Sequence, residues 1–197
     1  MTTTNGPVRL DMSMSLDGYI AGPDDRPGQE LGAGGFRLFN WLDDRESAGP
    51  SGQVYRESLA TGAVISGRRT FELAGRWNGD HHDNVPIFVL THRVEKGDIP
   101  PGSAQFVTDV EECVREARTV ASDRAVLVHG AGAAQALLLA GLLDEMEIHL
   151  VQVLLGGGRR LFDGLESRRI ELELVRRLDD RDVTHLRYQV VGSGDTR

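Results

Sequence analysis

Residues 62–75, GAVISGRRTFELAG, join a short apolar run directly to a segment with helical spacing. Ala63 to Ser66 is typical of a buried strand, because small and β-branched residues follow one another without a charge. The run RRTFEL then continues as a helix, for which Gly75 supplies a stop. A strand that leads straight into a helix is the repeating unit of an α/β sheet.

The same order recurs on both sides of this stretch. Residues 85–92, VPIFVLTH, and 125–130, AVLVHG, predict two more buried strands, and a very apolar helix follows the second. Another helix is expected from about Asp109, whose side chain can cap it together with Glu112. Residues 8–16 alternate between apolar and polar side chains, as a strand does. We therefore expect an α/β fold in which a mostly parallel sheet carries helices on both faces.

The C-terminal part of the chain departs from this order. Residues 170–178 and 183–191 are alternating runs separated by the polar turn DDRD, which predicts an antiparallel hairpin. Residues 38–60 have helical spacing that is broken around PSG at 50–52. Since no repeat or linker divides the chain, we expect a single domain over residues 1–197, with its core between about residues 8 and 191.

Composition and charge narrow the function. A net charge of −8 argues against a nucleic-acid partner, because phosphate backbones require basic surfaces. The only cysteine, Cys113, excludes an internal disulfide and a multi-cysteine zinc site. Neither a signal peptide nor an apolar run of about 20 residues is visible, so the expected location is cytoplasmic, with no membrane partner.

Arg68 and Arg69 stand where a helix begins, although the partial positive charge there normally attracts an acid or an anion. Two other strand ends carry similar groups. Thr-His-Arg occupies residues 91–93, and Gly-Ala-Gly at 130–132 opens a helix whose free N–H groups can bind phosphate. Ligands bind at such strand ends, so the three together predict one extended, multiply phosphorylated ligand. Taken singly, they also fit solvated arginines, a polar strand exit and tight helix packing.

Two common nucleotide-binding patterns do not fit. The chain has no Gly-Lys-Ser/Thr, which excludes a P-loop. A Rossmann fingerprint would follow the first strand, but here that strand leads into SLDGYIAG at 15–22, and the best glycine pair comes only at residue 130.

Five motifs occur in the order seen in the dihydrofolate reductase superfamily. They are MSLDGYIA at 14–21, GRRTFE at 67–72, VLTHR at 89–93, HGAGAAQALLLAGLLDE at 129–145 and VLLGGGRRLF at 153–162. Over about residues 8–191 the chain resembles the branch shared with the C-terminal reductase domain of riboflavin biosynthesis. This resemblance implies a three-layer, dihydrofolate-reductase-like α/β fold. It also implies an NADPH-dependent oxidoreductase that transfers a hydride to a small heterocyclic (pterin- or pyrimidine-like) or carbonyl substrate. The alternative is a non-catalytic NADP(H)-binding module on the same fold.

The resemblance further implies where NADPH binds. Arg68 would pair with the phosphate on the adenosine ribose, and Thr70 would bond the pyrophosphate. NADH lacks that ribose phosphate, so this arrangement favours NADPH. The expected cofactor residues are Gly18, Tyr19, Ile20, Gly67, Arg68, Arg69, Thr70, Leu90, Thr91, His92, Arg93, Gly130, Ala131, Gly132 and Ala133.

The substrate side is less defined. Candidates for contact with the substrate are Trp41, Gly157 and Arg159, although Trp41 also fits a core position and Arg159 a surface one. Asp17 and Asp43 are the catalytic candidates, and the sequence does not identify the proton donor. Asp44 and Glu46 are equal alternatives to Asp43, and all three also fit a solvated helix end.

His81 and His82 lie between two aspartates in GDHHD at 79–83. Neighbouring side chains of an extended segment point in opposite directions and no third ligand has suitable spacing, so we expect no metal and interpret this segment as a polar rim of the pocket. The final hairpin resembles an element that this branch uses in homodimers, so a homodimer and a small-molecule substrate are the expected partners.

Overall fold

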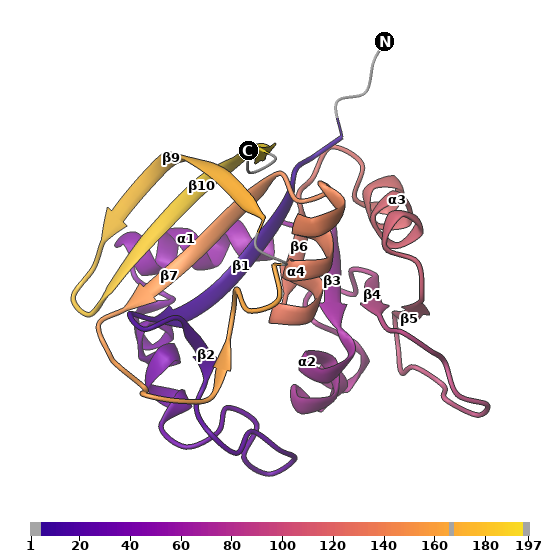
Figure 1. The fold of residues 1–197 in the computed structure, drawn as a ribbon, viewed down its shortest axis with the longest axis horizontal. Helices are drawn as coiled ribbons and strands as arrows, with labels where there is room; N and C mark the ends of the chain where they lie inside the picture. Colours follow the sequence, from indigo (N-terminus) through magenta and orange to yellow (C-terminus); the bar gives the residue numbers. More distant parts are fainter. Residues whose placement is uncertain (1–4, 166–167, 195–197) are drawn as a thin grey trace.

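The computed structural model describes residues 5–165 and 168–194 (Figure 1). Within them, one sheet has the strand order β5-β4-β3-β6-β1-β7-β10-β9. The strands are β1 Val8–Ser15, β3 Ala63–Gly67, β4 Ile87–Leu90, β5 Ala104–Val107, β6 Val126–His129, β7 Glu145–Val151, β9 Arg169–Asp179 and β10 Val183–Gly194. The strands from β5 to β7 are parallel, and β10 runs antiparallel to both β7 and β9. A separate pair joins β2 (Tyr19–Ala21) to β8 (Arg159–Arg160).

Helices cover both faces of the large sheet, as predicted. They are α1 Pro50–Leu59, α2 Arg68–Leu73, α3 Val110–Ala121 and α4 Ala131–Ala140, with two 3-10 helices, η1 Gly35–Asp44 and η2 Gly75–Gly79. Helices α3 and α4 pack on one face, where Leu137 joins Leu10 and Ile65 in the largest apolar cluster. On the other face, Phe71 of α2 packs against Val64 and Ile87. Figure 1 shows α4 in front of the sheet and α1 behind it. The three-layer α/β prediction is therefore confirmed.

Local sequence signals account for most element boundaries. Asp109 Oδ1 accepts the Glu112 N–H at 2.8 Å, which confirms the predicted cap of α3. The predicted hairpin is present as β9 and β10. Two expectations differ from the structure. The PSG segment begins α1, because proline is well suited to a first helical turn, and Leu16 lies beyond the end of β1 with 65% of its surface exposed.

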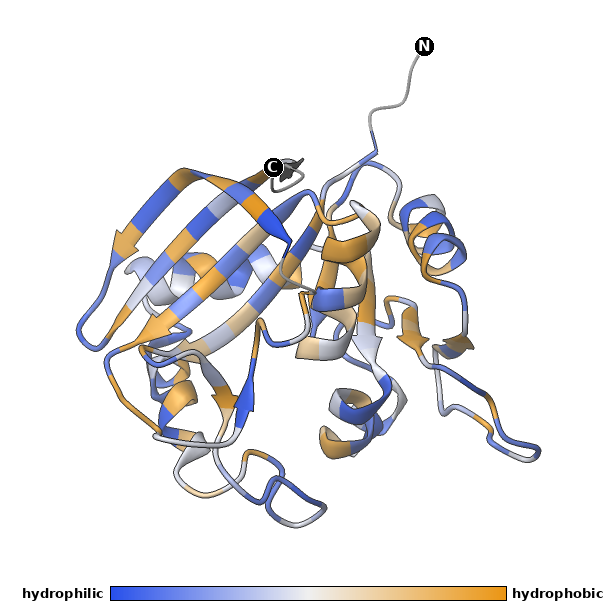
Figure 2. Cartoon of the chain, viewed as in Figure 1, coloured by the Kyte–Doolittle hydropathy of each residue, from blue (hydrophilic) through white to orange (hydrophobic). Residues whose placement is uncertain are grey.

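Hydrophobic residues are distributed according to the layers of the fold. Figure 2 shows α4 as mostly hydrophobic and the strands of the hairpin as striped. Leu172, Leu174 and Val175 of β9 are exposed, and the homodimer remains a prediction. Among the described residues, no helix has the length and apolar character needed to cross a bilayer.

The sheet face beneath α1 and η1 carries buried polar groups in place of an apolar core. Strand pairing places these groups in two neighbouring rows across the sheet. One row contains Asp11, Glu147, Arg187 and Arg176, and the next contains Ser13, His149 and His185. Glu147, His149 and His185 are almost completely buried. Buried charges are stable only when they are paired and hydrogen-bonded, so both rows depend on their partners.

Glu147 is the centre of an ion cluster that ties the hairpin and α1 to β7. Its carboxylate accepts hydrogen bonds from Arg187 of β10 and, at 3.2 Å, from Arg176 of β9. Both arginines also bind Glu57 of α1, each through a contact of 2.7 Å. Two arginines therefore face two carboxylates, and the cluster is balanced only when all four groups are present.

We predict that Glu147→Gln lowers the free energy of unfolding by about 3 kcal/mol, because it leaves two half-buried arginines with one carboxylate. Urea denaturation followed by circular dichroism measures this loss. The control is Glu171→Gln on β9, where an exposed carboxylate pairs with Arg169; its unfolding midpoint stays nearly unchanged. Equal midpoints for Glu147→Gln and wild type would contradict a stabilising role for this cluster.

Candidate active site

A cleft of about 1840 Å³ crosses the carboxyl ends of β1, β3, β4 and β6. Such strand ends are the usual ligand site of open α/β sheets. The lining falls into two parts. One part consists of the starts of α2 and α4 with the segment after β4, and the other consists of β1, β7, η1 and α1.

The first part is organised around the contact between α2 and α4. Gly130 precedes α4 with φ of +91°, and a Cβ on it would lie 2.2 Å from Thr70 Oγ1. A Cβ on Gly132 would meet nothing within 4 Å, so the backbone there borders open space. The first N–H groups of a helix have no partner within the helix. The start of α4 therefore offers backbone donors to the cleft.

The arginines at this end are held by acids. Arg68 contacts Asp98 through Nη1 at 2.6 Å and Glu72 through Nε at 2.7 Å, and its guanidinium lies 4.3 Å from the centre of the Phe106 ring. The hydrogen bond from Arg68 holds the pKa of Asp98 below its ordinary value. Arg69 pairs with Asp25 at 2.9 Å. An anionic ligand would compete with these acids for the guanidinium groups.

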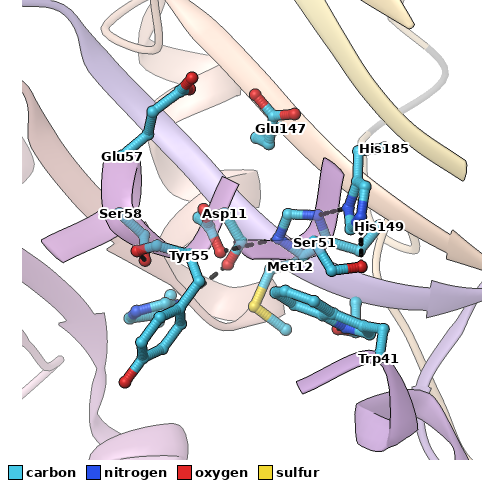
Figure 3. Close-up of polar contacts among 12 residues, drawn as sticks. Asp11, Met12, Trp41, Ser51, Tyr55, Glu57, Ser58, Glu147, His149 and His185 are labelled. Atoms are coloured by element: carbon cyan, nitrogen blue, oxygen red, sulfur yellow. Dashed lines mark hydrogen bonds and ion pairs between the residues drawn. The ribbon is translucent and has the colours of Figure 1, made fainter. Parts of the chain in front are cut away.

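The second part of the cleft is more enclosed (Figure 3). Trp41 is 6% exposed, and its Nε1 donates to Ser13 Oγ at 2.9 Å. The Trp41 ring centroid lies 4.5 Å from that of His149. Tyr55 of α1 borders the same space. Aromatic rings and a few polar groups are the usual lining of a site for a small flat molecule.

Asp11 and His149 meet on the floor of this part. Asp11 Oδ1 lies 3.1 Å from His149 Nε2, and the two side chains are 14% and 1% exposed. Burial acts to raise the pKa of Asp11, but His149, His129 and Arg9 together outweigh it and hold that pKa below its ordinary value. Asp11 is therefore ionised at neutral pH, although it lies deep in the fold.

A second group of histidines borders the same floor. His129 Nδ1 lies 3.0 Å from the carbonyl oxygen of Asp11, and His129 Nε2 lies 3.1 Å from His81 Nε2. His81 in turn meets His82 at 2.7 Å. Burial lowers the pKa of His129 and lowers that of His81 to about 3. Both rings are therefore neutral at physiological pH.

The structure brings most of the sequence-predicted residues together in this cleft. Those that line it are Ile20, Trp41, Gly67, Arg68, Arg69, Thr70, Leu90, Thr91, His92, Arg93, Ala131, Gly132, Ala133 and Arg159. Gly18, Tyr19, Gly130 and Gly157 are not part of the lining. The Tyr19 ring instead lies against the Arg160 guanidinium at 4.6 Å.

The two predicted catalytic candidates lie outside the lining. Asp17 accepts hydrogen bonds from Ser15 Oγ at 2.6 Å and from the N–H groups of Leu155 and Gly156. The Ser15 bond is the main reason why the pKa of Asp17 falls to about 2. Asp17 is thus a carboxylate that fixes the glycine loop and a poor proton donor, while Asp43 is an exposed residue of η1.

Sequence analysis did not identify Asp11, His129 or His149. The available signal was Asp11 itself, a charged residue inside a strand that lies at the centre of the sheet. His81 lines the cleft, as expected for a polar rim. In residues 5–165 and 168–194, no group of three or more His, Cys, Asp or Glu side chains is arranged to hold a metal ion.

Comparison with known proteins gives one family match. The model of the RibD C-terminal domain family matches residues 7–186. No curated protein sequence matches the chain significantly.

Solved structures agree in fold. A putative riboflavin biosynthesis protein from Shewanella sp. PV-4 has a TM-score of 0.70 at 22% identity, over 93% of this chain and 98% of that one. The diaminohydroxyphosphoribosylaminopyrimidine deaminase/5-amino-6-(5-phosphoribosylamino)uracil reductase of Thermotoga maritima has a TM-score of 0.64 at 15% identity, over 94% of this chain and 57% of that one. Dihydrofolate reductase from Enterococcus faecalis, complexed with NADP(H), has a TM-score of 0.54 at 13% identity, over 97% and 98%. The dihydrofolate-reductase-like fold is confirmed.

We predict that Gly130→Ala destabilises the junction of α2 and α4. The backbone conformation of Gly130 is open almost only to glycine and costs other residues about 1–3 kcal/mol. The new methyl group would also displace Thr70. Thermal unfolding measures the change. Gly132→Ala is the control, because its Cβ meets no atom and alanine favours a helix. A melting temperature for Gly130→Ala equal to that of Gly132→Ala would show that the junction tolerates a side chain.

Proposed function

Because this chain belongs to the RibD C-terminal domain family, we propose that it is a reductase that transfers a hydride from NADPH to a small pyrimidine- or pterin-like heterocycle or carbonyl compound. One observation carries the proposal: a single cleft joins a cationic end at Arg68 to an enclosed end at Trp41 and Asp11. Its volume of about 1840 Å³ exceeds the roughly 300–1,000 Å³ of an ordinary ligand pocket, so it has room for a dinucleotide and a second small molecule.

The residues at the cationic end fit a phosphorylated cofactor. The start of α4 offers backbone donors, and Gly132 leaves them uncovered. Arg68, Arg93 and Lys96 border a smaller cavity of about 510 Å³ beside the cleft, which suits a further phosphate. NADPH would supply the hydride when bound, and the protein would supply its position. Two relatives support this assignment, since one is named a uracil reductase and the other was solved with NADP(H).

The enclosed end suits the substrate. Trp41, Phe39 and Tyr55 offer ring surfaces for a flat molecule, while Asp11 and His149 offer polar contacts at the floor. Turnover separates this reductase from a non-catalytic NADP(H)-binding module. Loss of NADPH absorbance in the presence of a panel of reducible pyrimidines, pterins and small carbonyl compounds supports the reductase, and binding without any turnover supports the module.

Arg68→Ala is expected to weaken NADPH binding by about 10- to 100-fold and to leave NADH binding unchanged, because a lost charge-assisted hydrogen bond costs about 1.5–3 kcal/mol. Quenching of tryptophan fluorescence reports binding, since both Trp41 and Trp77 line the cleft. Arg115→Ala, which removes an exposed arginine of α3, is the control. An equal loss for NADPH and NADH would exclude Arg68 as the contact to the ribose phosphate.

Asp98→Asn is expected to strengthen NADPH binding several-fold. The substitution removes a carboxylate that holds Arg68 and that would repel a phosphate in the same position. Fluorescence titration with NADPH and NADH measures the change, and only the NADPH value should move. Glu171→Gln is the control, because its exposed carboxylate pairs with Arg169 on β9, away from the residues that line the cleft. Weaker NADPH binding in Asp98→Asn would mean that Asp98 positions Arg68 and does not compete with the cofactor.

A further inference from the structure

Four hydrogen bonds connect the floor of the cleft to the turn between β9 and β10. They run from Asp11 to His149 at 3.1 Å, to His185 at 2.9 Å, to Ser51 at 3.3 Å and to Asp180 at 2.7 Å. Figure 3 shows those that join Asp11, His149, His185 and Ser51. His149, His185 and Ser51 are at most 1% exposed, whereas Asp180 lies near the surface. Each link must contain one proton, so the order of donors along the chain can be worked out from the surface inwards.

The Asp180 end of this series of hydrogen bonds fixes the direction in which protons are donated. Asp180 Oδ2 receives both the hydroxyl and the backbone N–H of Ser51, and the hydroxyl bond is the main reason why the pKa of Asp180 lies below its ordinary value. The only hydroxyl proton of Ser51 is therefore given to Asp180. Ser51 Oγ must then accept from His185, so the proton of His185 is on Nε2.

The inner end follows from this direction. Burial lowers the pKa of His185 to about 4, so its ring is neutral and Nδ1 has no proton. His185 Nδ1 must accept from His149, which places a proton on His149 Nδ1. The remaining nitrogen, His149 Nε2, faces Asp11 Oδ1. Two lone pairs cannot face each other at 3.1 Å, so one further proton is shared between His149 and Asp11.

We propose that the Asp11–His149 pair, which lines the cleft, is the proton donor of the reduction, and that His185, Ser51 and Asp180 are positioning residues that keep its proton between His149 Nε2 and Asp11 Oδ1. This inference rests on the proposed function. The pair gives its proton to the nitrogen or oxygen of a C=N or C=O bond, while the carbon accepts a hydride from the reduced nicotinamide, which becomes oxidised. Asp11 is left as a carboxylate beside a neutral His149, and the pair regains one proton from solvent.

Charged and titratable groups surround the pair. After loss of the shared proton, the carboxylate of Asp11 faces the lone pair of His149 Nε2. The charged or titratable groups that face the pair are Arg9 from β1, Glu147 from β7, His129 from β6 and His185 from β10, with Tyr55 from α1 bordering the same cleft.

The first test needs no substrate. Two-bond 15N–1H correlation spectra of protein labelled with 15N-histidine, recorded at pH 7, should show His149 with both nitrogens protonated and His185 neutral with its proton on Nε2. In Asp11→Asn, His149 becomes neutral, because the amide of asparagine can donate to Nε2. In Asp180→Asn, His185 loses its single tautomer, while Asp179→Asn in the same turn changes neither ring. A neutral His149 in the wild-type protein would overturn the proposal.

A folding check is needed for these variants. Asp11→Asn keeps the size of the side chain, and thermal unfolding checks that the protein is folded. If this variant does not fold, Asp180→Asn carries the test, since it alters a surface turn. An unchanged His185 tautomer in Asp180→Asn would then overturn the assigned direction of the chain.

Activity provides the second test. With NADPH and a substrate found in the panel, Asp11→Asn should lower kcat about 10²- to 10⁴-fold, the usual contribution of a general acid, and leave NADPH affinity unchanged. An unaltered kcat in a variant that still binds NADPH would overturn the proton-donor assignment alone. Absence of NADPH binding by the wild-type protein would instead overturn the proposed function, and the spectra would still decide where the proton lies.

Discussion

The carboxylate of Asp11, placed on a central strand of the sheet, imposes a requirement that much of the structure meets. An ionised group in the interior is costly unless it is paired and hydrogen-bonded. Strand β7 supplies His149 as the partner, and β6 adds His129 at the backbone of the same residue. Helix α1 and η1 must then cover a polar surface, which explains why Ser51 and Trp41 turn polar atoms towards the sheet.

Two neighbouring rows of side chains on the same strands have different roles, one in stability and one in the cleft. The row through Glu147 binds the hairpin and α1 together, and the next row, through His149, forms the floor of the cleft. Side chains alternate along a strand, so a slip of one residue in the pairing of β7 with β1 would turn both rows to the apolar face. The ion cluster joins β7 to β10 and β9, and it therefore favours the register that places His149 beside His185.

Local patterns predicted the parts of the fold that depend on nearby residues. The strands that lead into α2 and α4, the Asp109 cap and the final hairpin all follow from spacing and turn chemistry. The polar row of β1 was visible as an alternation, but whether such a row faces solvent or a buried partner depends on which strands lie beside it. Asp11 and His149 are 138 positions apart, and no local signal joins them. Likewise, Arg68 was evident as a cation at a helix start, whereas its pairing with Asp98 depends on how the segment after β4 folds back.

The two ends of the cleft differ in the energetic cost of replacing a side chain or its partner. Arg68 and Arg69 are 28% and 51% exposed, and ion pairs at such positions are screened by solvent, so their partners can be exchanged at small energetic cost. Asp11 and His149 are 14% and 1% exposed, and removal of either partner leaves an uncompensated group. On the proposed function, cofactor preference could therefore vary through a few surface acids, whereas the end at Asp11 and His149 is tied to the register of the sheet. A substrate must therefore fit a cleft floor whose side chains, Asp11 and His149, are held in place by the sheet.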